Sequence, residues 1–170
     1  MKNLESTYYA CSEISEIHFK VFASHKGIRA IFLNKKDGTI QSDNLIHLQA
    51  DDPFLFGVFD ELKEYFNKKR KSFSVPLDFT GSEFQLKVWN ELQKIPYGET
   101  VSYKTIAERL GDEKLIRAVG KANGANPIPI IVPCHRVINS DGSLAGYSAG
   151  LKIKEKLLKL EGSLDLTLFE

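Results

Sequence analysis

The chain has 170 residues, of which 42% are hydrophobic and 26% are charged. That length supports one substantial core or two small ones. Lys and Arg number 23 against 22 Asp and Glu, so the net charge neither supports nor excludes a nucleic-acid partner. The two cysteines, Cys11 and Cys134, do not make the disulfide framework of a small secreted protein. The N-terminus lacks the apolar segment of a signal peptide and no apolar run approaches membrane-spanning length. We therefore expect a protein of the cytoplasm (or of the nucleus, if eukaryotic) with no membrane partner.

The first half of the chain predicts strands followed by a helix. Residues 14–33 alternate apolar and polar side chains, which is typical of two strands joined by a turn at residues 24–27. Asp37-Gly38 is a further hairpin signal. Asp51-Asp52-Pro53 predicts a helix start, with acids at the N-terminus and Pro in the first turn. The basic segment 68–71 after this helix is interpreted as solvated cations near a helix C-terminus, although a nucleic-acid patch is the alternative.

From residue 80 onward the pattern becomes mostly helical. Thr80-Gly81-Ser82-Glu83 predicts a capping box at the start of a helix. Ser102 is expected to cap a short helix that ends at Gly111, and Asp112 to open a second one that runs to about residue 123. Two short helices joined by a tight turn form a helix-turn-helix.

The remaining segments complete a winged arrangement. Residues 128–138 are predicted to be extended, residues 139–142 to form a hairpin turn of a wing, and residues 150–161 to form a final amphipathic helix. The fold expected is therefore α/β (α+β) with two domains, residues 1–77 and residues 78–170.

Pro133-Cys134-His135-Arg136 is the segment best suited to chemistry. Neighbouring His and Arg lower the pKa of a thiol and favour the nucleophilic thiolate. In an extended chain adjacent side chains point to opposite faces, so His135 would reach Cys134 through a water or a local kink. A histidine base also needs an orienting partner, and Glu155 is our candidate. These residues alone leave a buried structural cysteine as an equal alternative, whereas a metal site is disfavoured because too few ligands are present.

A basic stretch precedes that segment. Between residues 114 and 136 the charged side chains are Lys114, Arg117, Lys121 and Arg136, with no acid. Small residues among them would let a helix approach a DNA groove closely, and an arginine can replace a displaced base. The alternative is a helix whose small residues pack internally while its cations are solvated.

Residues 130–137, with the sequence IIVPCHRV, resemble the active-site signature of the O6-alkylguanine-DNA alkyltransferases, or methylated-DNA–protein-cysteine methyltransferases. The resemblance runs from about Phe84 to Gly162 and includes further blocks in order: residues 88–89, 95–103, 117–120, 126–127 and 146–151. The N-terminal half matches only in its pattern of strands and a helix. The resemblance implies a ribonuclease-H-like N-terminal domain and a helical, winged helix-turn-helix C-terminal domain.

The resemblance also implies roles for individual residues. Cys134 would accept the alkyl group, His135 would activate it through water, and Glu155 would orient His135. Asn126 resembles the hinge asparagine, and Tyr103 the tyrosine that rotates the target nucleotide outward.

Other positions would contact the substrate. Arg117 resembles the arginine that fills the gap left by the extruded guanine. Further DNA-facing positions are Lys104, Ala118, Gly120, Lys121 and Ser140. The guanine pocket would be lined by Pro129, Val137, Tyr147 and Ser148.

A family member of this kind transfers the alkyl group from O6-alkylguanine, and in some cases from O4-alkylthymine, irreversibly to its own cysteine after flipping out the base. It acts once, as a single-turnover enzyme. We expect a monomer that binds double-stranded DNA containing alkylated guanine and uses no cofactor and no metal. Ala145 and Ala149 stand where some relatives carry glycine, which puts the transfer of bulky groups such as benzyl in doubt.

Two other functions remain open on the sequence. A non-catalytic protein that binds alkylguanine lesions is one, although relatives of that kind carry tryptophan at the cysteine position. A Cys-His-Glu hydrolase is the other, but it would leave Tyr103, Arg117 and Asn126 unexplained.

Overall fold

The computed structural model describes residues 6–164, so the last six residues of the C-terminal tail lie outside the described part of the chain. The chain divides after Thr80 into two compact units, three residues beyond the expected boundary.

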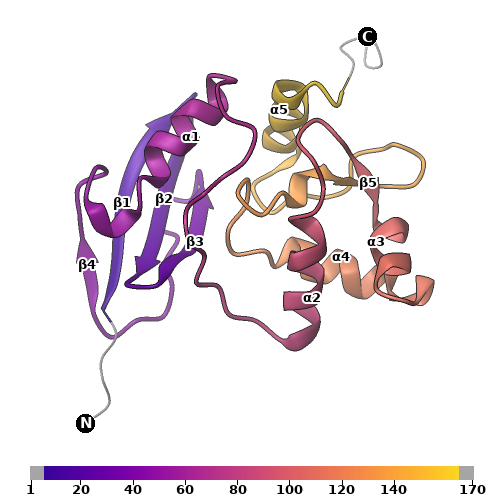
Figure 1. The fold of residues 1–170 in the computed structure, drawn as a ribbon, viewed down its shortest axis with the longest axis horizontal. Helices are drawn as coiled ribbons and strands as arrows, with labels where there is room; N and C mark the ends of the chain where they lie inside the picture. Colours follow the sequence, from indigo (N-terminus) through magenta and orange to yellow (C-terminus); the bar gives the residue numbers. More distant parts are fainter. Residues whose placement is uncertain (1–5, 165–170) are drawn as a thin grey trace. The chain divides into compact units, whose positions relative to one another are not determined.

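The N-terminal unit is built on a four-stranded sheet in the order β3-β2-β1-β4 (Figure 1). Its strands are β1 (Thr7–Ile14), β2 (Ile17–Ser24), β3 (Gly27–Leu33) and β4 (Leu45–His47). The first three strands pair antiparallel, and β4 pairs parallel with β1. The turn at residues 24–27 is confirmed, because Ser24 pairs with Gly27 across it.

The hairpin predicted at Asp37-Gly38 is wrong. After β3 the chain crosses to the other edge of the sheet, where β4 joins β1. The outer edge of β3 is instead occupied by residues 76–78. The amide of Ile28 donates to the carbonyl of Pro76 at 2.8 Å, and the amide of Asp78 donates to the carbonyl of Ile28 at 2.8 Å. A strand returning directly after residue 38 would need that edge.

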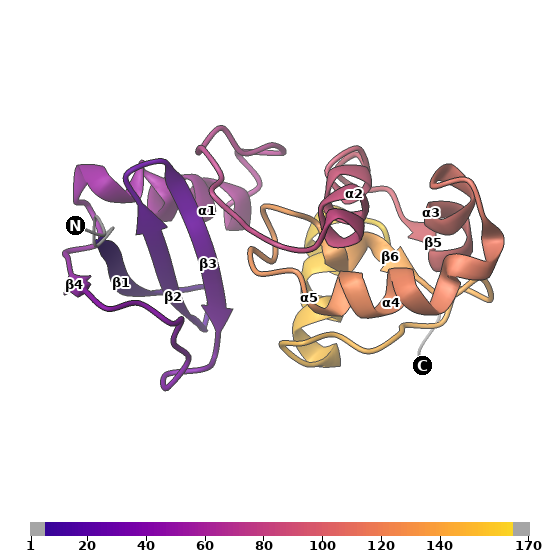
Figure 2. The same cartoon turned by 90° about the horizontal axis from the view of Figure 1, so that it is seen from below.

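One helix, α1 (Val58–Phe66), covers a face of this sheet (Figure 2). Asp52 caps only a short 3₁₀ turn, Pro53–Leu55, by accepting a hydrogen bond from the amide of Phe54 at 3.0 Å. Phe56 and Gly57 then adopt left-handed backbone angles, with φ of 55° and 70°, which end that turn before α1 begins. The helix predicted from Asp52 is therefore broken into two pieces by two left-handed residues.

The C-terminal unit is mostly helical. It contains α2 (Glu83–Leu92), α3 (Tyr103–Arg109), α4 (Ile116–Gly124) and α5 (Leu151–Glu161), with a short parallel pair of β5 (Val101–Ser102) and β6 (Val137–Ile138). The capping box of α2 joins Ser82 to Gln85, two residues later than predicted. Ser102 caps α3 as predicted, by accepting a hydrogen bond from the amide of Thr105 at 3.0 Å.

The helix-turn-helix is formed by α3 and α4. Gly111, with φ of 97°, makes the turn, and Asp112 caps the 3₁₀ turn Glu113–Leu115 that leads into α4. Trp89 on α2 donates a hydrogen bond from its indole nitrogen to the carbonyl of Ala122 at 2.8 Å, which fixes α4 against α2. This contact determines which face of α4 packs against α2, and the opposite face of α4 is exposed to solvent.

The extended conformation predicted for residues 128–138 is wrong. The amide of Val132 donates to the carbonyl of Ile128 at 3.0 Å, Ile130 has a positive φ of 76°, and Cys134–Arg136 form a 3₁₀ turn. Asn126 closes this loop, since its side chain accepts from the amide of Ile128 at 3.0 Å and donates to the carbonyl of Val132 at 2.8 Å. A side chain that bonds the backbone on both sides offers the segment an alternative to a sheet ladder.

The turn of the predicted wing is present, because the amide of Gly142 donates to the carbonyl of Asn139 at 3.0 Å. The strand before it, β6, pairs with β5 and not with a returning wing strand. Within residues 6–164, no helix is both long enough and apolar enough to cross a lipid bilayer.

Candidate active site around Cys134

Cys134 opens a 3₁₀ turn in the interior of the C-terminal unit. It is only 2% exposed, and its amide donates to the carbonyl of Val132 at 2.8 Å. Asn126 bonds that same carbonyl, so the backbone just before the thiol is fixed by two hydrogen bonds. The thiol is thereby placed at a fixed position under the protein surface.

The surroundings of the thiol act on its pKa in opposite directions. Burial raises the pKa of Cys134, while hydrogen bonds with Asn126 and Tyr147 and the positive charge of Lys154 lower it, and the net result is a raised pKa. The resting sulfur is therefore protonated at neutral pH. The groups that stabilise a thiolate are nevertheless already in place, so a base that removes the proton leaves the anion with donors around it.

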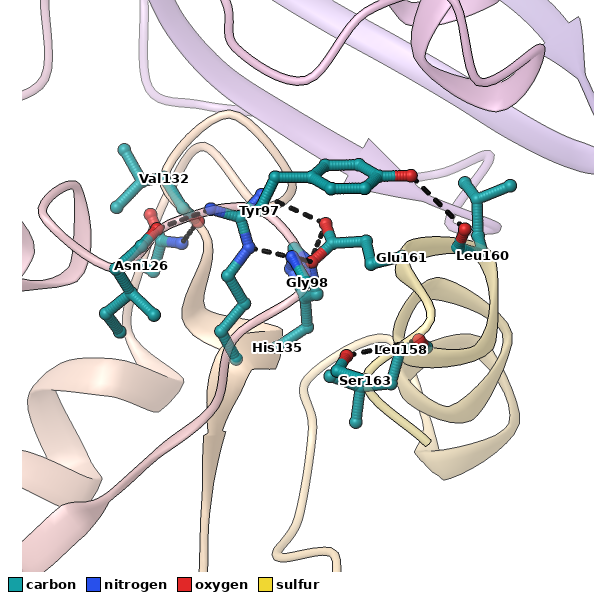
Figure 3. A network of polar contacts seen from close by, with 11 residues as sticks. Tyr97, Gly98, Asn126, Val132, His135, Leu158, Leu160, Glu161 and Ser163 are labelled. Atoms are coloured by element: carbon teal, nitrogen blue, oxygen red, sulfur yellow. Dashed lines mark hydrogen bonds and ion pairs between the residues drawn. The ribbon is translucent and has the colours of Figure 1, made fainter. Parts of the chain in front are cut away.

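His135 supplies such a base. Its imidazole is fully buried, and its Nε2 lies 2.9 Å from Oε1 of Glu161 (Figure 3). Burial lowers the pKa of His135 and outweighs the opposing effect of Glu161, so the ring is neutral. Because an ionised carboxylate only accepts hydrogen bonds, Nε2 must carry the ring proton. Nδ1 then holds the free lone pair, and this buried atom has no hydrogen-bond partner among the described residues.

The acid that orients His135 is Glu161, and the prediction of Glu155 for this role is wrong. Glu155 is paired instead with Lys159, one turn further along the same helix, at 2.6 Å. The side chain of Glu161 is completely buried, whereas that of Glu155 is 38% exposed. Six residues separate the two acids, which places them on different faces of α5.

Glu161 is kept ionised by Arg136. The guanidinium of Arg136 donates from Nε to Oε2 at 2.9 Å and from Nη2 to Oε1 at 3.0 Å, and the amide of Gly98 donates to Oε2 at 3.3 Å. Burial alone would raise the pKa of Glu161, but hydrogen bonds from His135 and Arg136 and the charge of Arg136 lower it to about 2. Arg136 also donates to the carbonyl of Ile95 at 2.6 Å, which anchors the pair to the turn that follows α2.

Lys154 is a second charged group that the sequence analysis missed. It is fully buried, and its ammonium group donates to the carbonyls of Val137 at 2.6 Å and Ala145 at 3.3 Å. Burial lowers the pKa of Lys154 to about 8, against the opposing effect of Cys134. A cation that is present at neutral pH and lost just above it therefore lies next to the thiol.

A signal for both missed residues was present in the helix. The buried positions of α5 are Ile153, Lys154, Leu157, Leu158 and Glu161, a single stripe at helical spacing. Two charged side chains on an apolar stripe indicate partners in the interior. Glu155 lies off that stripe.

Tyr103 also lies at the site. It begins α3, is half-buried, and its pKa is raised by burial and by the proximity of Cys134. Of the predicted pocket residues, Pro129 and Val137 are buried, Tyr147 is half-buried and lowers the pKa of Cys134, and Ser148 is exposed. The structure thus brings Cys134, His135, Asn126, Tyr103 and Tyr147 together.

The predicted DNA-facing residues lie mainly on α4. Arg117 and Lys121 are exposed, and Ala118 and Gly120 are half-buried, while Val119 and Ala122 face the core. Ser140 is exposed in the turn after β6. Lys104 is already paired, at 2.9 Å with Glu113 and 3.9 Å with Glu108, so its charge is partly neutralised within the protein.

Gly120 is not required by packing inside the protein. A Cβ atom built on it would meet no atom within 4 Å, and the same holds for Gly124 one turn later. A helical glycine costs about 1 kcal/mol relative to alanine. Both lie near Arg117 and Lys121 on the outward part of α4, which favours a surface that another molecule approaches closely.

Within the described part of the chain, no three His, Cys, Asp or Glu side chains come together as metal ligands would. The acid-base pair and the thiol are the chemically competent groups that the geometry assembles.

Two family models match the sequence. Residues 83–163 match the DNA-binding domain of 6-O-methylguanine DNA methyltransferase, and residues 8–79 match the ribonuclease-like domain of the same family. The N-terminal half, for which the sequence showed only a pattern, is thereby assigned as well.

Curated relatives agree with these matches. A methylated-DNA–protein-cysteine methyltransferase of Methanosarcina acetivorans is 59% identical over 103 residues, which cover 61% of this chain and 66% of the relative. One of Mycobacterium bovis is 52% identical over 127 residues, covering 73% and 77%.

The fold is also found among solved structures. The crystal structure of Mycobacterium tuberculosis OGT in complex with DNA is 37% identical, with a TM-score of 0.82, and the match covers 92% of this chain and 93% of that one. The expected two-domain α+β class, with a ribonuclease-like and a DNA-binding part, is confirmed.

Proposed function

The chain belongs to the 6-O-methylguanine DNA methyltransferase family and is a DNA-repair alkyltransferase, and from that premise we propose that Cys134 takes the alkyl group from O6-alkylguanine in double-stranded DNA. The observation that carries this assignment is the buried chain of contacts from Glu161 to His135, with the free Nδ1 of His135 next in line, beside a thiol already surrounded by donors.

The proposed step begins with removal of the thiol proton. Nδ1 of His135 accepts it through a bridging water, and Glu161 stabilises the imidazolium that forms. The thiolate then attacks the alkyl carbon, so that an S–C bond forms while the bond between that carbon and O6 of guanine breaks. The electron pair of the broken bond stays on the purine, where a proton from Tyr103 neutralises it.

The product is a thioether, whose S–C bond a His-Glu pair does not hydrolyse. Each molecule would therefore act once. This property separates the proposal from a Cys-His-Glu hydrolase, whose acyl-enzyme would turn over.

The guanine has to leave the duplex to react. Cys134 is 2% exposed, so no base that remains stacked can bring its O6 to the sulfur. Extruding the nucleotide costs a few kcal/mol. Protein contacts in the gap that it leaves in the base stack must offset this cost. Arg117, exposed on α4, is placed to enter the stack, and the open surface at Gly120 allows the helix to approach the groove.

The remaining assignments follow from the same contacts. Asn126 holds the loop between α4 and the 3₁₀ turn and lowers the pKa of the thiol, and Tyr147 bounds the pocket beside it. All of these groups come from one chain, so the proposed reaction needs no residue from a second copy, and we propose that the protein acts as a monomer.

Mass spectrometry of the intact protein tests the proposal. After incubation with a duplex that carries O6-methylguanine, the protein should gain one methyl group, and the adduct should map to Cys134. Cys134→Ala should bind the duplex and gain nothing. Lesion binding by the unaltered protein without any mass increase would instead favour a non-catalytic lesion-binding protein.

The same assay addresses substrate range. Ala145 and Ala149 are both half-buried in the segment that leads into α5. A duplex that carries O6-benzylguanine should react more slowly than one that carries O6-methylguanine. The variant with both Ala145→Gly and Ala149→Gly should show a smaller difference between the two transfer rates. An equal rate for both duplexes in the unaltered protein would contradict the expected narrow pocket.

A further inference from the structure

Asn123 carries a buried hydrogen-bond acceptor that none of the roles above uses. The residue lies on the inward face of α4 and is 4% exposed. Its side-chain nitrogen donates to the backbone carbonyl of Cys134 at 3.4 Å. Its side-chain oxygen, Oδ1, is also buried and has no hydrogen-bond partner among residues 6–164. One half of this amide is therefore paired at the turn that carries the thiol, and the other half is an empty acceptor.

The carbonyl of Cys134 determines which way the amide of Asn123 is turned. A carbonyl oxygen only accepts hydrogen bonds, so the part of the amide that faces it must be the NH₂ group. The opposite orientation would place Oδ1 against that carbonyl, and the two oxygens would repel each other. Because Oδ1 and the nitrogen belong to one planar amide, the empty acceptor is held close to the peptide of Cys134.

Packing alone does not explain an asparagine at this position. Burial of an amide oxygen without a partner is unfavourable, and asparagine is a poor helix former, whereas a leucine of similar shape would avoid both costs. Nδ1 of His135 is likewise buried without a partner in the described part of the chain, and the proposed reaction brings it a proton. An unpaired buried group calls for an explanation, and a role in binding or catalysis is one.

The extruded base is a ligand that brings a donor to this place. O6 and the 2-amino group of guanine lie on the same edge of the base, on either side of N1. Alkylation of O6 removes the proton from N1, which leaves the 2-amino group as the donor on that edge. A base that presents O6 to the sulfur of Cys134 therefore presents an N–H donor to the surroundings of the same residue.

We propose that Oδ1 of Asn123 accepts a hydrogen bond from the 2-amino group of the extruded O6-alkylguanine, an inference that rests on the proposed function. Asn123 is then a specificity-determining residue, which recognises the base while His135 and Glu161 manage the proton of the thiol. A site that pairs with an N–H group rejects an analogue without it, because its own acceptor stays empty. O4-alkylthymine has no amino group on its pairing edge, so this contact favours the guanine lesion.

The burial of the site increases the value of such an acceptor. Cys134 is 2% exposed, so a base that reaches its sulfur leaves water as well as the duplex. The 2-amino group gives up its partner on cytosine when the base is extruded. In a buried site it would remain unpaired, at a cost, unless the protein supplies an acceptor. Asn123 supplies one at the residue to which the base must come.

Single-turnover kinetics with two duplexes test the proposal. The duplexes are identical except that one carries O6-methylguanine and the other O6-methylhypoxanthine, which lacks only the 2-amino group. Each is reacted, at saturating concentration, with the unaltered full chain, with Asn123→Leu and with Asn123→Ala. Trp89→Phe is the matched control, because it removes a different buried hydrogen bond to α4, at the carbonyl of Ala122. The preference of each protein is the ratio of its two rates of methyl transfer.

The preference should depend on the acceptor of Asn123. Loss of the 2-amino group also weakens pairing with cytosine and makes extrusion easier, but this contribution is common to all variants and cancels when their ratios are compared. The preference for O6-methylguanine should fall about tenfold in Asn123→Leu, the effect of one neutral hydrogen bond. Asn123→Ala should lower it as well. Trp89→Phe should keep the preference within twofold, even where its thermal midpoint is lower.

Two results would overturn the proposal. If Asn123 is merely structural, Asn123→Leu and Asn123→Ala slow both duplexes by the same factor and leave the preference unchanged. If Trp89→Phe lowers the preference as much as Asn123→Leu does, any weakening of α4 is sufficient. Both variants at residue 123 lack the acceptor, so either one carries the comparison if the other fails to fold.

Failure of the proposed function would be seen separately. The unaltered protein would then transfer no methyl group from either duplex, and both the function and this contact would be withdrawn. Transfer from both duplexes, with a preference that Asn123→Leu does not alter, would leave the proposed function standing and remove the contact alone.

Discussion

The two units of the molecule treat buried polar groups differently. Among the described residues of the N-terminal unit, the buried polar or charged side chains are Thr7, Ser24 and Glu61. Up to Ser163 and the residue that follows it, the described part of the C-terminal unit buries six: Asn123, Asn126, His135, Arg136, Lys154 and Glu161. Moreover, each of these six contacts Cys134, its loop, or the acid that orients His135.

Buried charge therefore has a structural role in the N-terminal unit and surrounds the candidate active site in the C-terminal unit. Glu61 accepts hydrogen bonds from the amide and the hydroxyl of Ser74 and lies 3.4 Å from Arg70, which holds the segment after α1 in place. Around Cys134, by contrast, burial raises the pKa of the thiol and lowers those of the imidazole and the ammonium group, while hydrogen bonds and charge lower that of the carboxylate. Such a group of perturbed residues is typical of an active site.

The largest effect is expected when the two buried acids are compared by substitution. Glu161→Gln leaves Arg136 buried without a counter-charge, at a cost of about 3 kcal/mol, and removes the anion that orients His135. Methyl transfer should slow about a hundredfold or more. Glu61→Gln should cost about 1 kcal/mol and leave the transfer rate unchanged. Denaturant unfolding and single-turnover kinetics measure both, and a similar rate for the two variants would remove the distinction between the units.

Acid unfolding gives the next effect. The pKa of Glu161 is lowered from 4.5 to about 2 in the folded protein, so its contribution to stability is complete above the unfolded value and is lost as the pH falls from about 5 to 2. Linkage gives a loss of about 3 kcal/mol in the free energy of unfolding over that window. Unfolding curves recorded at several pH values should show this slope in the unaltered protein and in Glu61→Gln. A slope of the same size in Glu161→Gln would assign it to another group.

A third comparison concerns two lysines. Lys154→Met removes the cation beside the thiol and should slow transfer about tenfold at neutral pH, because the thiolate loses about 1.4 kcal/mol of stabilisation. Since the pKa of Lys154 is about 8, the transfer rate of the unaltered protein should rise less steeply with pH above that value, and the variant should show no such bend.

The matched control for that comparison is Lys20→Met. Lys20 in the N-terminal unit lies over the rings of Tyr9 and Phe22, so its charge is used in packing. This variant should keep both the rate and the bend. A bend that persists in Lys154→Met would show that another group titrates there.

The smallest effect concerns two glycines. Gly120→Ala should stabilise α4 by up to about 1 kcal/mol, because the added Cβ meets no atom, and yet weaken duplex binding. Gly27→Ala in the N-terminal unit should destabilise instead, since its Cβ would lie 2.5 Å from the carbonyl oxygen of Pro76, and should leave binding unchanged. Thermal midpoints and duplex Kd values report the two effects. Unchanged binding by Gly120→Ala would remove α4 from the proposed interface.

Local signals predicted local structure well. The turn at residues 24–27, the Ser102 cap of α3 and the amphipathic helix ending at Glu161 depend on contacts between residues close in sequence, and the structure confirms them. Predictions failed where a distant segment competed for the same backbone. The edge of β3 is taken by residues 76–78, so Asp37-Gly38 forms no hairpin, and Asn126 bonds the loop that was expected to be extended.

The sequence by itself determined the family, because the residues that carry this conclusion form short continuous motifs. It also predicted the two-domain class and the pairing of Cys134 with His135. Only the tertiary structure decided which acid serves His135. Glu155 and Glu161 lie on one helix with equal charge, and the choice depends on which face of α5 packs against the loop of Cys134. Arg136 and the amide of Gly98 converge on that face and stabilise an ion there, whereas Glu155 is left in solvent with Lys159.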